Sequence, residues 1–525
     1  MSARPLATAL VEIVGQSNLL TDQADREYYS QDISGAGETV VEFVVRPGTV
    51  TELQETVRAC TAAGFAVVPR GGGMSYTLGY VPTRPQSVTI DLTRLNRIRE
   101  VNTVDRYVVV EAGCTWGALY EALNAVAMRT PFFGPLSGHN ATIGGALSQH
   151  ASFFGSAGHG GVAESVLGLT VVLADGELVR TGAGSGPGIR PTEFGPNATQ
   201  LFLGECGAFG IKAETVLRTQ PVTDHVSFAS FAFDQAAGMA RAQIAMAGDP
   251  GLSECFGFDP QSHANLAKSG FSVLESAQIV GDIAKSESTF TNKVDALTQL
   301  VTANKRFVKD LRYSLHVVVE GEDPSVVSNR LDRITATAES AGGTPIPDVI
   351  ARVTRSRPFR PIKALLGPEG ELWLPVHAVF RLSESAAAAA RIETLIDSLK
   401  PDAAKLDITM SRLCVSSGSS IIQEVHLFWP DRLTPFHLRN ATSDQRQRYA
   451  NRTANPTARA AAHAIRAELA AAMRAAGGWH LQVGKYYPFA SEIDAETKRF
   501  LAAIKQTVDP KGLMNPGSLN LTDEP

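Results

Sequence analysis

The chain has 525 residues, 44% of them hydrophobic, and a net charge of −5 from 48 basic and 53 acidic residues. A chain of this length and apolar content should form two or three folding units, which excludes a mainly disordered protein. The basic residues form no concentrated block, which argues against nucleic acid as a partner. The five cysteines are far apart and include no CxxC pair, so neither a disulfide framework nor a structural metal is expected.

The N-terminal segment predicts an amphipathic helix rather than a signal peptide, because Glu12 interrupts its short apolar run. No apolar stretch in the sequence is long enough to span a bilayer. We therefore expect a cytoplasmic protein without a membrane span. A homodimer is one assembly that the sequence leaves open.

The first part of the chain, up to about residue 221, mixes strands with capped helices. Strands are predicted at 40–45, 66–69, 88–92 and 108–112, and helices at 49–64 and after residue 115. Thr49 and Glu52 match a capping box, and Gly64 is a typical helix end. Asp175-Gly176 lies between two β-branched runs and predicts a hairpin. Together these elements predict an α+β unit.

From about residue 225 the pattern changes to longer strands and helices without glycine clusters. Strands are predicted at 255–258, 313–319, 372–380, 409–415 and 423–429, and helices at 233–246, 325–341, up to 399, and from 455 to 477. This order indicates a second domain whose sheet is covered by helices on one face. The segment 479–521 adds its own predicted strand, a helix at 495–508 and a turn cluster.

The most informative motif is the glycine loop at 69–76, PRGGGMSY, which follows a short predicted strand. Three successive glycines can turn their N–H groups toward one point without a Cβ in the way, which suits an anionic pyrophosphate. Alone the loop could be a flexible turn, and it matches neither GxGxxG nor a P-loop. Further glycine-rich segments follow at 141–146, 155–161 and 201–211. Turns alone hardly explain so many glycines, which indicate close approach of the backbone to a flat or charged ligand.

In this order the motifs resemble the FAD-binding domain of the vanillyl-alcohol oxidase and p-cresol methylhydroxylase family, a PCMH-type domain. The shared segments are an RGGG loop, ATIGG, VLGL followed by ADG, a GxxGxxGI pattern, and DPxGxxNPG, which stands here at 509–517. The match covers roughly residues 38–220 and 478–520. The resemblance implies an α+β fold with an FAD-binding domain in two parts, 1–224 and 478–525. A ferredoxin-like α/β cap, or substrate, domain would occupy 225–477.

The resemblance also implies which residues bind FAD. They are Pro69, Arg70, Gly71, Gly72, Gly73, Met74, Ser75, Pro135, Thr142, Ile143, Gly144, Gly145, Ser148, Gly155, His159, Gly160, Val166, Gly210, Ile211 and Asn515. His159 stands where the family usually has tyrosine, and it could simply pack beside the cofactor. We expect dissociable FAD, because Ser75 stands where covalent relatives often place histidine and residues 416–422 include none.

The implied catalytic residues are Tyr76, His426, His480 and Arg381, with His377 also near the flavin ring. Tyr76 and His480 match phenol-binding positions of the family, and with His426 they could polarise or deprotonate an aromatic hydroxyl. Each could instead be an ordinary packed tyrosine or histidine, so only their convergence on one cleft would favour chemistry.

Two departures from the family limit this prediction. Residues 135–140 carry no carboxylate where vanillyl-alcohol oxidase has an acidic residue beside the flavin. The histidine-rich metal cluster of the relatives that oxidise lactate or hydroxyglutarate is also missing, so no metal is expected.

The sequence therefore predicts a flavoprotein oxidoreductase that oxidises a small alcohol, preferably aromatic or phenolic, by hydride transfer to flavin N5. Oxygen or a redox partner would reoxidise the flavin. One alternative is a 2-hydroxy-acid dehydrogenase of the lactate or glycolate type, with Arg381 or Arg412 binding the substrate carboxylate. Others are non-redox use of FAD, as in alkyl-dihydroxyacetonephosphate synthase, and a nucleotide-binding protein without activity.

Overall fold

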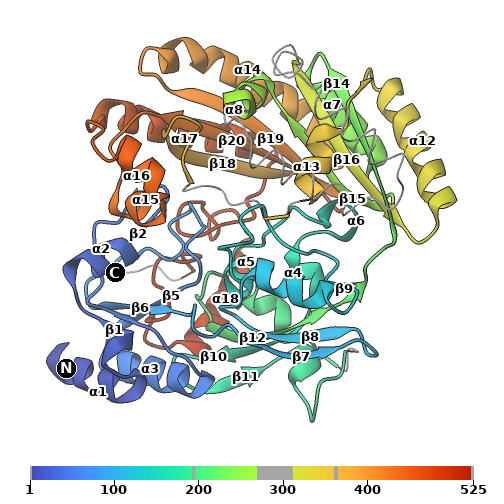
Figure 1. Ribbon diagram of the computed structural model, residues 1–525. Helices are drawn as coiled ribbons and strands as arrows, with labels where there is room; N and C mark the ends of the chain where they lie inside the picture. The colour runs from blue at the N-terminus through green and yellow to red at the C-terminus, as the bar shows by residue number, and fades with distance from the viewer. Residues whose placement is uncertain (1–2, 192–194, 269–310, 357, 360–364, 522–525) are drawn as a thin grey trace.

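The computed structural model describes residues 3–191, 195–268, 311–356, 358–359 and 365–521. In Figure 1 the chain forms two bodies, one above the other, and both termini lie in the lower one. The lower body contains the N-terminal part and the C-terminal segment, and the upper body contains the middle of the chain. This arrangement confirms the expected α+β fold with a two-part domain and a cap.

The first sheet of the lower body carries the glycine loop. Its order is β1 (Leu19–Leu20), β4 (Phe43–Val45), β6 (Ser87–Asp91) and β5 (Ala66–Arg70), with β4, β6 and β5 parallel. Nearby lie α1 (Ala3–Val14), α2 (Gln23–Tyr29), α3 (Val50–Ala62), β2 (Gln31–Asp32) and β3 (Gly35–Ala36). Residues of α1 and α3 form one apolar core with the sheet. The predicted cap of α3 is present, since Thr49 Oγ1 accepts a hydrogen bond from Glu52 N at 3.0 Å.

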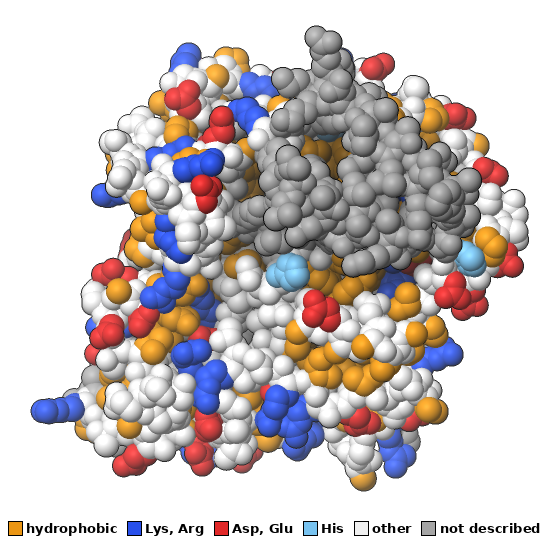
Figure 2. Space-filling view, viewed as in Figure 1, with side chains coloured by type: hydrophobic (Ala, Val, Ile, Leu, Met, Phe, Trp, Pro, Cys, Tyr) orange, Lys and Arg blue, Asp and Glu red, His pale blue; other side chains and the backbone are white. Residues whose placement is uncertain are grey.

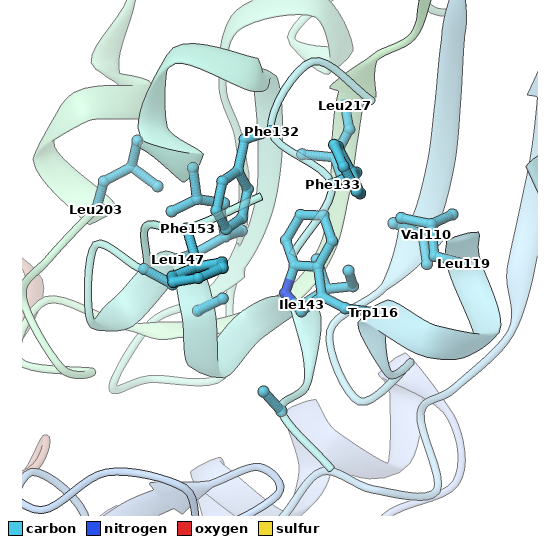
Figure 3. Close-up of a cluster of buried hydrophobic side chains, with 14 of the residues drawn as sticks. Val110, Trp116, Leu119, Phe132, Phe133, Ile143, Leu147, Phe153, Leu203 and Leu217 are labelled. Carbon is cyan, nitrogen blue, oxygen red and sulfur yellow. The ribbon is translucent and has the colours of Figure 1, made fainter. Parts of the chain in front are cut away.

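The second sheet of the lower body is antiparallel. Its order is β11 (Leu178–Arg180), β10 (Val166–Val172), β12 (Ile211–Arg218), β8 (Tyr107–Glu111) and β7 (Ile98–Asn102). Between and beside these strands lie α4 (Trp116–Asn124), β9 (Met128–Arg129), α5 (Ile143–Ser148), α6 (Ser156–His159) and β13 (Gln220–Pro221). The hairpin predicted at Asp175-Gly176 joins β10 to β11. Figure 3 shows the core on this sheet, where Trp116, Phe132, Phe133 and Ile143 pack together.

The cap domain is built on a seven-stranded antiparallel sheet. Its order is β17 (Thr344–Ile346), β14 (His225–Phe233), β16 (Tyr313–Gly321), β15 (Leu252–Phe258), β19 (Thr409–Ser417), β20 (Ser420–Trp429) and β18 (Leu372–Arg381). Helices α7 (Ala236–Met246), α12 (Pro324–Ser340), α14 (Leu382–Ala404) and α17 (Pro456–Ala475) cover one face. The other face meets the lower body, because Phe256, Val415 and Ile422 share a core with Phe153.

Four shorter helices complete the cap: α8 (Pro260–Lys268), α13 (Val349–Ser356), α15 (Pro435–Asn440) and α16 (Ser443–Tyr449). The C-terminal helix α18 (Ala495–Val508) returns to the lower body, where Lys505 Nζ donates to the Ala208 carbonyl at 2.6 Å. We propose domain boundaries near residues 224 and 477, since β14 begins at His225 and α17 ends at Ala475.

Two sequence-based predictions need correction. The helix predicted at 233–246 begins only at Ala236, because Phe233 ends strand β14, which the sequence analysis did not predict. The strand predicted within 479–521 does not form, and Trp479 makes only an isolated bridge with Val379.

Where Figure 2 colours the side chains by type, acidic and basic residues are interspersed. Among the described helices, none combines the length and the apolar character needed to cross a bilayer.

Candidate cofactor cleft and active site

A cavity of about 810 Å³, including the space at its open mouth, lies where the loop after β5 meets α5. Twelve of the predicted FAD-binding residues line it: Pro69, Arg70, Gly71, Gly72, Gly73, Met74, Ser75, Pro135, Thr142, Gly144, Gly145 and Ser148. Residues that the sequence analysis did not single out also line it, among them Tyr80, Gln149, Cys206 and Gln482.

The glycine loop passes so close to its neighbours that side chains would not fit. A Cβ at Gly72 would lie 1.7 Å from the carbonyl oxygen of Asn140. Gly73 has φ +71°, a conformation that residues with a Cβ rarely adopt. Glycine here therefore keeps the backbone N–H groups accessible at the wall of the cavity.

Arg70 is a buried cation at the same wall. Its residue is 3% exposed, and its guanidinium lies 4.6–4.8 Å from the ring centroids of Tyr28, Tyr29 and Tyr80. It also donates to the Tyr28 carbonyl at 3.1 Å, but no described carboxylate is within ion-pair distance of it. A buried guanidinium without a counter-charge favours an anion, so this cavity fits the diphosphate of FAD.

The other eight predicted FAD-binding residues do not line this cavity. Ile143 and Ile211 are buried in apolar cores, Val166 packs on one, and Gly210 lies against Val171. Asn515 donates from its side chain to the carbonyl of Gly79 at 2.8 Å and to that of Cys206.

Gly155, His159 and Gly160 lie where the lower body meets the cap. Gly155 N donates to Glu254 Oε1 of the cap at 3.1 Å, and Gly160 approaches Gly418. Burial and the nearby charge of Arg129 lower the pKa of His159. The cofactor role of these residues stays a prediction.

A second cavity, of about 870 Å³, adjoins the first. Both are lined by Met74, Pro135, Ser137 and Gln482. The remaining walls of the second cavity come from the lower body and from the cap sheet: Tyr76, Leu136, Ser152, Phe153, Leu365, Trp373, His377, Leu413, Val415, Ile422, Glu424, His426 and Leu481. A group bound in the first cavity would thus face a ligand in the second.

Four polar side chains in the wall of the second cavity contact one another in a chain. Tyr76 donates from its hydroxyl to Glu424 Oε1 at 2.7 Å, and His377 Nδ1 lies 3.3 Å from the same hydroxyl. The other oxygen, Glu424 Oε2, is 3.5 Å from His426 Nε2. Cap and lower body therefore both contribute to one polar cluster.

Burial and neighbouring charges decide the protonation of this cluster. Burial lowers the pKa of His377 to about 3, so its ring is neutral. Burial and the charge of Glu424 raise the pKa of Tyr76 well above its usual value. Burial also tends to raise the pKa of Glu424, but its contacts with His426, His377 and Tyr76 outweigh this effect and lower it. At neutral pH the cluster therefore holds a carboxylate and a protonated tyrosine.

Of the predicted catalytic residues, Tyr76 and His426 line the second cavity, and His480 lies behind it. His480 Nδ1 donates to the His377 carbonyl at 2.7 Å, and its ring stacks on Tyr487 with centroids 3.6 Å apart. The ring of His377 thus lies next to Tyr76, in the place expected for His480.

The expected placement of two arginines needs correction. The side chain of Arg381 is 78% exposed and pairs with Glu384, because Arg381 is the last residue of β18 and lies beyond His377, which lines the cavity. Arg412 is buried against the helices, and its Nη2 donates to Gln423 Oε1 at 3.1 Å. Strand alternation explains this, since its neighbour Leu413 lines the cavity. Neither arginine lines either cavity.

Glu424 is the residue that the sequence analysis missed. Ile422, Glu424 and His426 alternate along β20 and all line the second cavity. Because side chains two apart in a strand share a face, the candidate His426 already indicated position 424. Among the described residues, no group of three or more His, Cys, Asp or Glu side chains is arranged to bind a metal.

Comparisons with known proteins agree with this geometry. Residues 41–182 match the family model of an FAD binding domain. An uncharacterized FAD-linked oxidoreductase of Mycobacterium tuberculosis is 30% identical over 230 residues, 43% of this chain and 48% of that protein. A mitochondrial D-lactate dehydrogenase (cytochrome) of Arabidopsis thaliana is 28% identical over 40% of this chain and 36% of its own length. The chain thus matches less than half the length of these relatives.

The whole chain also resembles a solved structure in fold. It matches p-cresol methylhydroxylase with substrate bound at a TM-score of 0.73 and 17% identity, over 98% of this chain and 96% of that one. Residues 41–182 are thus an FAD binding domain, and the chain as a whole has the fold of p-cresol methylhydroxylase.

Proposed function

We propose that the protein is an FAD-dependent oxidoreductase that oxidises a small alcohol, preferably an aromatic or phenolic one. The observation that carries this proposal is the adjacency of two cavities that share Met74, Pro135, Ser137 and Gln482. The first fits a diphosphate and the second holds a carboxylate, a tyrosine and a histidine. The similarity to an FAD-linked oxidoreductase in sequence and to p-cresol methylhydroxylase in fold supports the same reaction class.

In this proposal FAD supplies the acceptor for a hydride from the substrate carbon. The loop at Gly71–Gly73 and Arg70 would hold its diphosphate. In the second cavity, His426, paired with Glu424, would accept the proton of the substrate hydroxyl. Apolar side chains such as Phe153 and Leu413 would exclude water and pack against the body of the substrate.

The 2-hydroxy-acid alternative has support from the matched D-lactate dehydrogenase. It would require a cation to pair with the substrate carboxylate. Arg381 and Arg412, the residues expected for this role, lie outside both cavities. We therefore place the alcohol first and keep the hydroxy acid, the non-redox enzyme and the nucleotide-binding protein as outcomes of the test.

The test is anaerobic mixing of the FAD-containing protein with 4-hydroxybenzyl alcohol, 1-hexanol and D-lactate. We expect 4-hydroxybenzyl alcohol to bleach the flavin absorbance fastest. Faster bleaching by D-lactate would favour the hydroxy-acid enzyme, and no bleaching by any compound would contradict the proposal. Admitting air to the reduced protein then distinguishes oxygen from a redox partner as the acceptor.

Two histidine variants locate the proton acceptor. His426→Asn should slow bleaching about a hundredfold, because it removes a group that contacts the substrate. His480→Asn should slow it far less, since His480 lies behind His377. Equal effects of the two substitutions would contradict the assignment of His426.

A further inference from the structure

Tyr76 and Glu424 give one wall of the second cavity a hydroxyl oxygen and a carboxylate, both of which act as hydrogen-bond acceptors. We propose that this cavity selects its ligand by charge and hydrogen-bond direction. It takes an apolar or aromatic compound whose polar end is an uncharged hydroxyl or an ammonium group, and it rejects carboxylates. The inference rests on the proposed function in that it names the substrate class of the same site.

The hydrogen bond from Gln482 to His377 decides which atoms of His377 and Tyr76 donate and which accept. Its backbone N–H lies 3.4 Å from His377 Nε2, and a backbone N–H can only donate. His377 Nε2 therefore accepts. A neutral imidazole carries one hydrogen, which then lies on Nδ1 and points to the Tyr76 hydroxyl at 3.3 Å.

The hydroxyl hydrogen of Tyr76 is already in a hydrogen bond. A hydroxyl has one hydrogen to donate, and that of Tyr76 goes to Glu424 Oε1 at 2.7 Å. One of its lone pairs receives His377, which leaves one lone pair for a ligand. Tyr76 therefore offers a ligand an acceptor, and it cannot donate to a phenolate or a carboxylate without breaking the bond to Glu424.

Glu424 adds a charge to this acceptor wall. Its ionised carboxylate has no hydrogen to donate. Two imidazoles lie beside it in the cavity wall: that of His377 is neutral, because burial lowers its pKa to about 3, and that of His426 has Nε2 3.5 Å from Glu424 Oε2. If His426 is protonated, the pair is neutral, and if it is not, the pair carries one negative charge. In neither state does the pair attract an anion.

The rest of the second cavity suits an aromatic or aliphatic body. Phe153, Leu413, Val415, Ile422 and Leu481 supply apolar walls, and no described arginine or lysine lines the cavity. The ring of Trp373 lies against both Tyr76 and His426, with centroids 5.8 and 5.4 Å apart. An ammonium group at this wall would meet a carboxylate and aromatic faces, both of which attract cations.

The test measures binding with three probes of one shape: benzyl alcohol, benzylammonium and benzoate. Each is titrated anaerobically into the FAD-containing protein, and the shift in flavin absorbance gives its dissociation constant. We expect benzoate to bind at least about a hundredfold more weakly than the other two, because it places like charges together. Binding of benzoate as tight as that of benzyl alcohol, or binding of none of the three, would overturn the inference.

Glu424→Gln identifies the source of the discrimination. Glutamine keeps the shape of the side chain and removes the charge, so the preference against benzoate should fall below about tenfold. A matched control is Glu393→Gln, since Tyr313 also donates to Glu393 but on the helix-covered face of the sheet. The control should keep the full preference.

Tyr76→Phe is the second variant, which tests the inference if Glu424→Gln does not fold. It leaves the charge of Glu424 in place, so benzoate should still bind at least about a hundredfold more weakly than benzylammonium. Loss of this preference in Tyr76→Phe, or its full retention in a folded Glu424→Gln protein, contradicts the inference.

These results are separable from the proposed function, because binding needs no turnover. If the probes bind in the expected order but no alcohol bleaches the flavin, the proposed function fails and the ligand class stands. If D-lactate bleaches the flavin and binds more tightly than neutral 1,2-propanediol, the ligand class fails while an oxidoreductase remains.

Discussion

Arg466 Nη2 donates to the carbonyl oxygen of Tyr76 at 2.7 Å, and the same guanidinium donates through Nε to the Pro375 carbonyl at 3.0 Å. Arg466 belongs to α17 and is 1% exposed, and its guanidinium lies 3.6 Å from the ring centroid of Tyr486. One buried side chain thus joins the loop after the glycines to the cap strand that carries His377. This contact holds the backbone of Tyr76 against that strand.

Arg466→Met should destabilise the protein and slow flavin reduction. Methionine fills similar space but leaves two buried carbonyls without donors, which should cost about 2–4 kcal/mol in the free energy of unfolding. Urea unfolding measures this cost, and anaerobic stopped-flow measures reduction. The control is Arg474→Met on the same helix, whose 38% exposed side chain pairs with Glu492 and should cost less than about 1 kcal/mol. Equal costs in the two variants would contradict the role given to Arg466.

Gly72→Ala should yield protein with little bound FAD. The added Cβ would lie 1.7 Å from the Asn140 carbonyl oxygen, so the glycine loop must move away from its observed position. The ratio of flavin to protein absorbance after purification measures the loss. Gly186→Ala is the control, because a Cβ there meets nothing within 4 Å. Full FAD content in a folded Gly72→Ala protein would disprove the cofactor role of the loop.

FAD should leave the protein when it is precipitated with acid. Ser75 offers no imidazole, and no described histidine lines the first cavity. Burial raises the pKa of the Cys206 thiol, which does line it, to about 12, so the sulfur is not a thiolate at neutral pH. Flavin absorbance in the supernatant measures release. A yellow pellet would mean covalent attachment, and Cys206→Ser would then show whether this thiol is the site.

Stability should decrease as the pH falls below about 6.5. His316 is fully buried between Ser230 and Ser314, and burial lowers its pKa from 6.5 to about 3. Between these values the unfolded chain binds a proton that the folded chain does not, so the free energy of unfolding falls with pH. The expected slope is about 1.4 kcal/mol per pH unit for each such histidine.

His316→Gln tests this dependence, because glutamine can replace both hydrogen bonds but does not titrate. Urea unfolding at pH 5 and pH 7 should show a smaller difference for the variant than for the natural protein. Above pH 7 the two slopes should be equal. An unchanged difference between pH 5 and pH 7 would show that His316 does not set this dependence.

Local chemistry let the sequence predict the glycine loop and much of the secondary structure. The glycines at 71–73 and the caps at Thr49, Thr115 and Asn455 act on backbone atoms within a few residues, so their effect is readable along the chain. The helix at 495–508 has the predicted bounds for the same reason, since Asp494 accepts a hydrogen bond from Thr497 N at 2.8 Å. These features also carry the resemblance to the FAD-binding family.

The second cavity depended on contacts between distant segments. Tyr76 and Glu424 are 348 residues apart, and nothing near either residue indicates the other. From the sequence, Arg381 and Arg412 were plausible partners for a substrate carboxylate. In the structure, Arg381 is the last residue of β18, and Arg412 on β19 faces the helices that cover the sheet. The sequence by itself determined the glycine loop, because capping and φ are local properties. Only the tertiary structure decided which polar groups meet the ligand, because strand pairing and domain contact place each side chain on one face or the other.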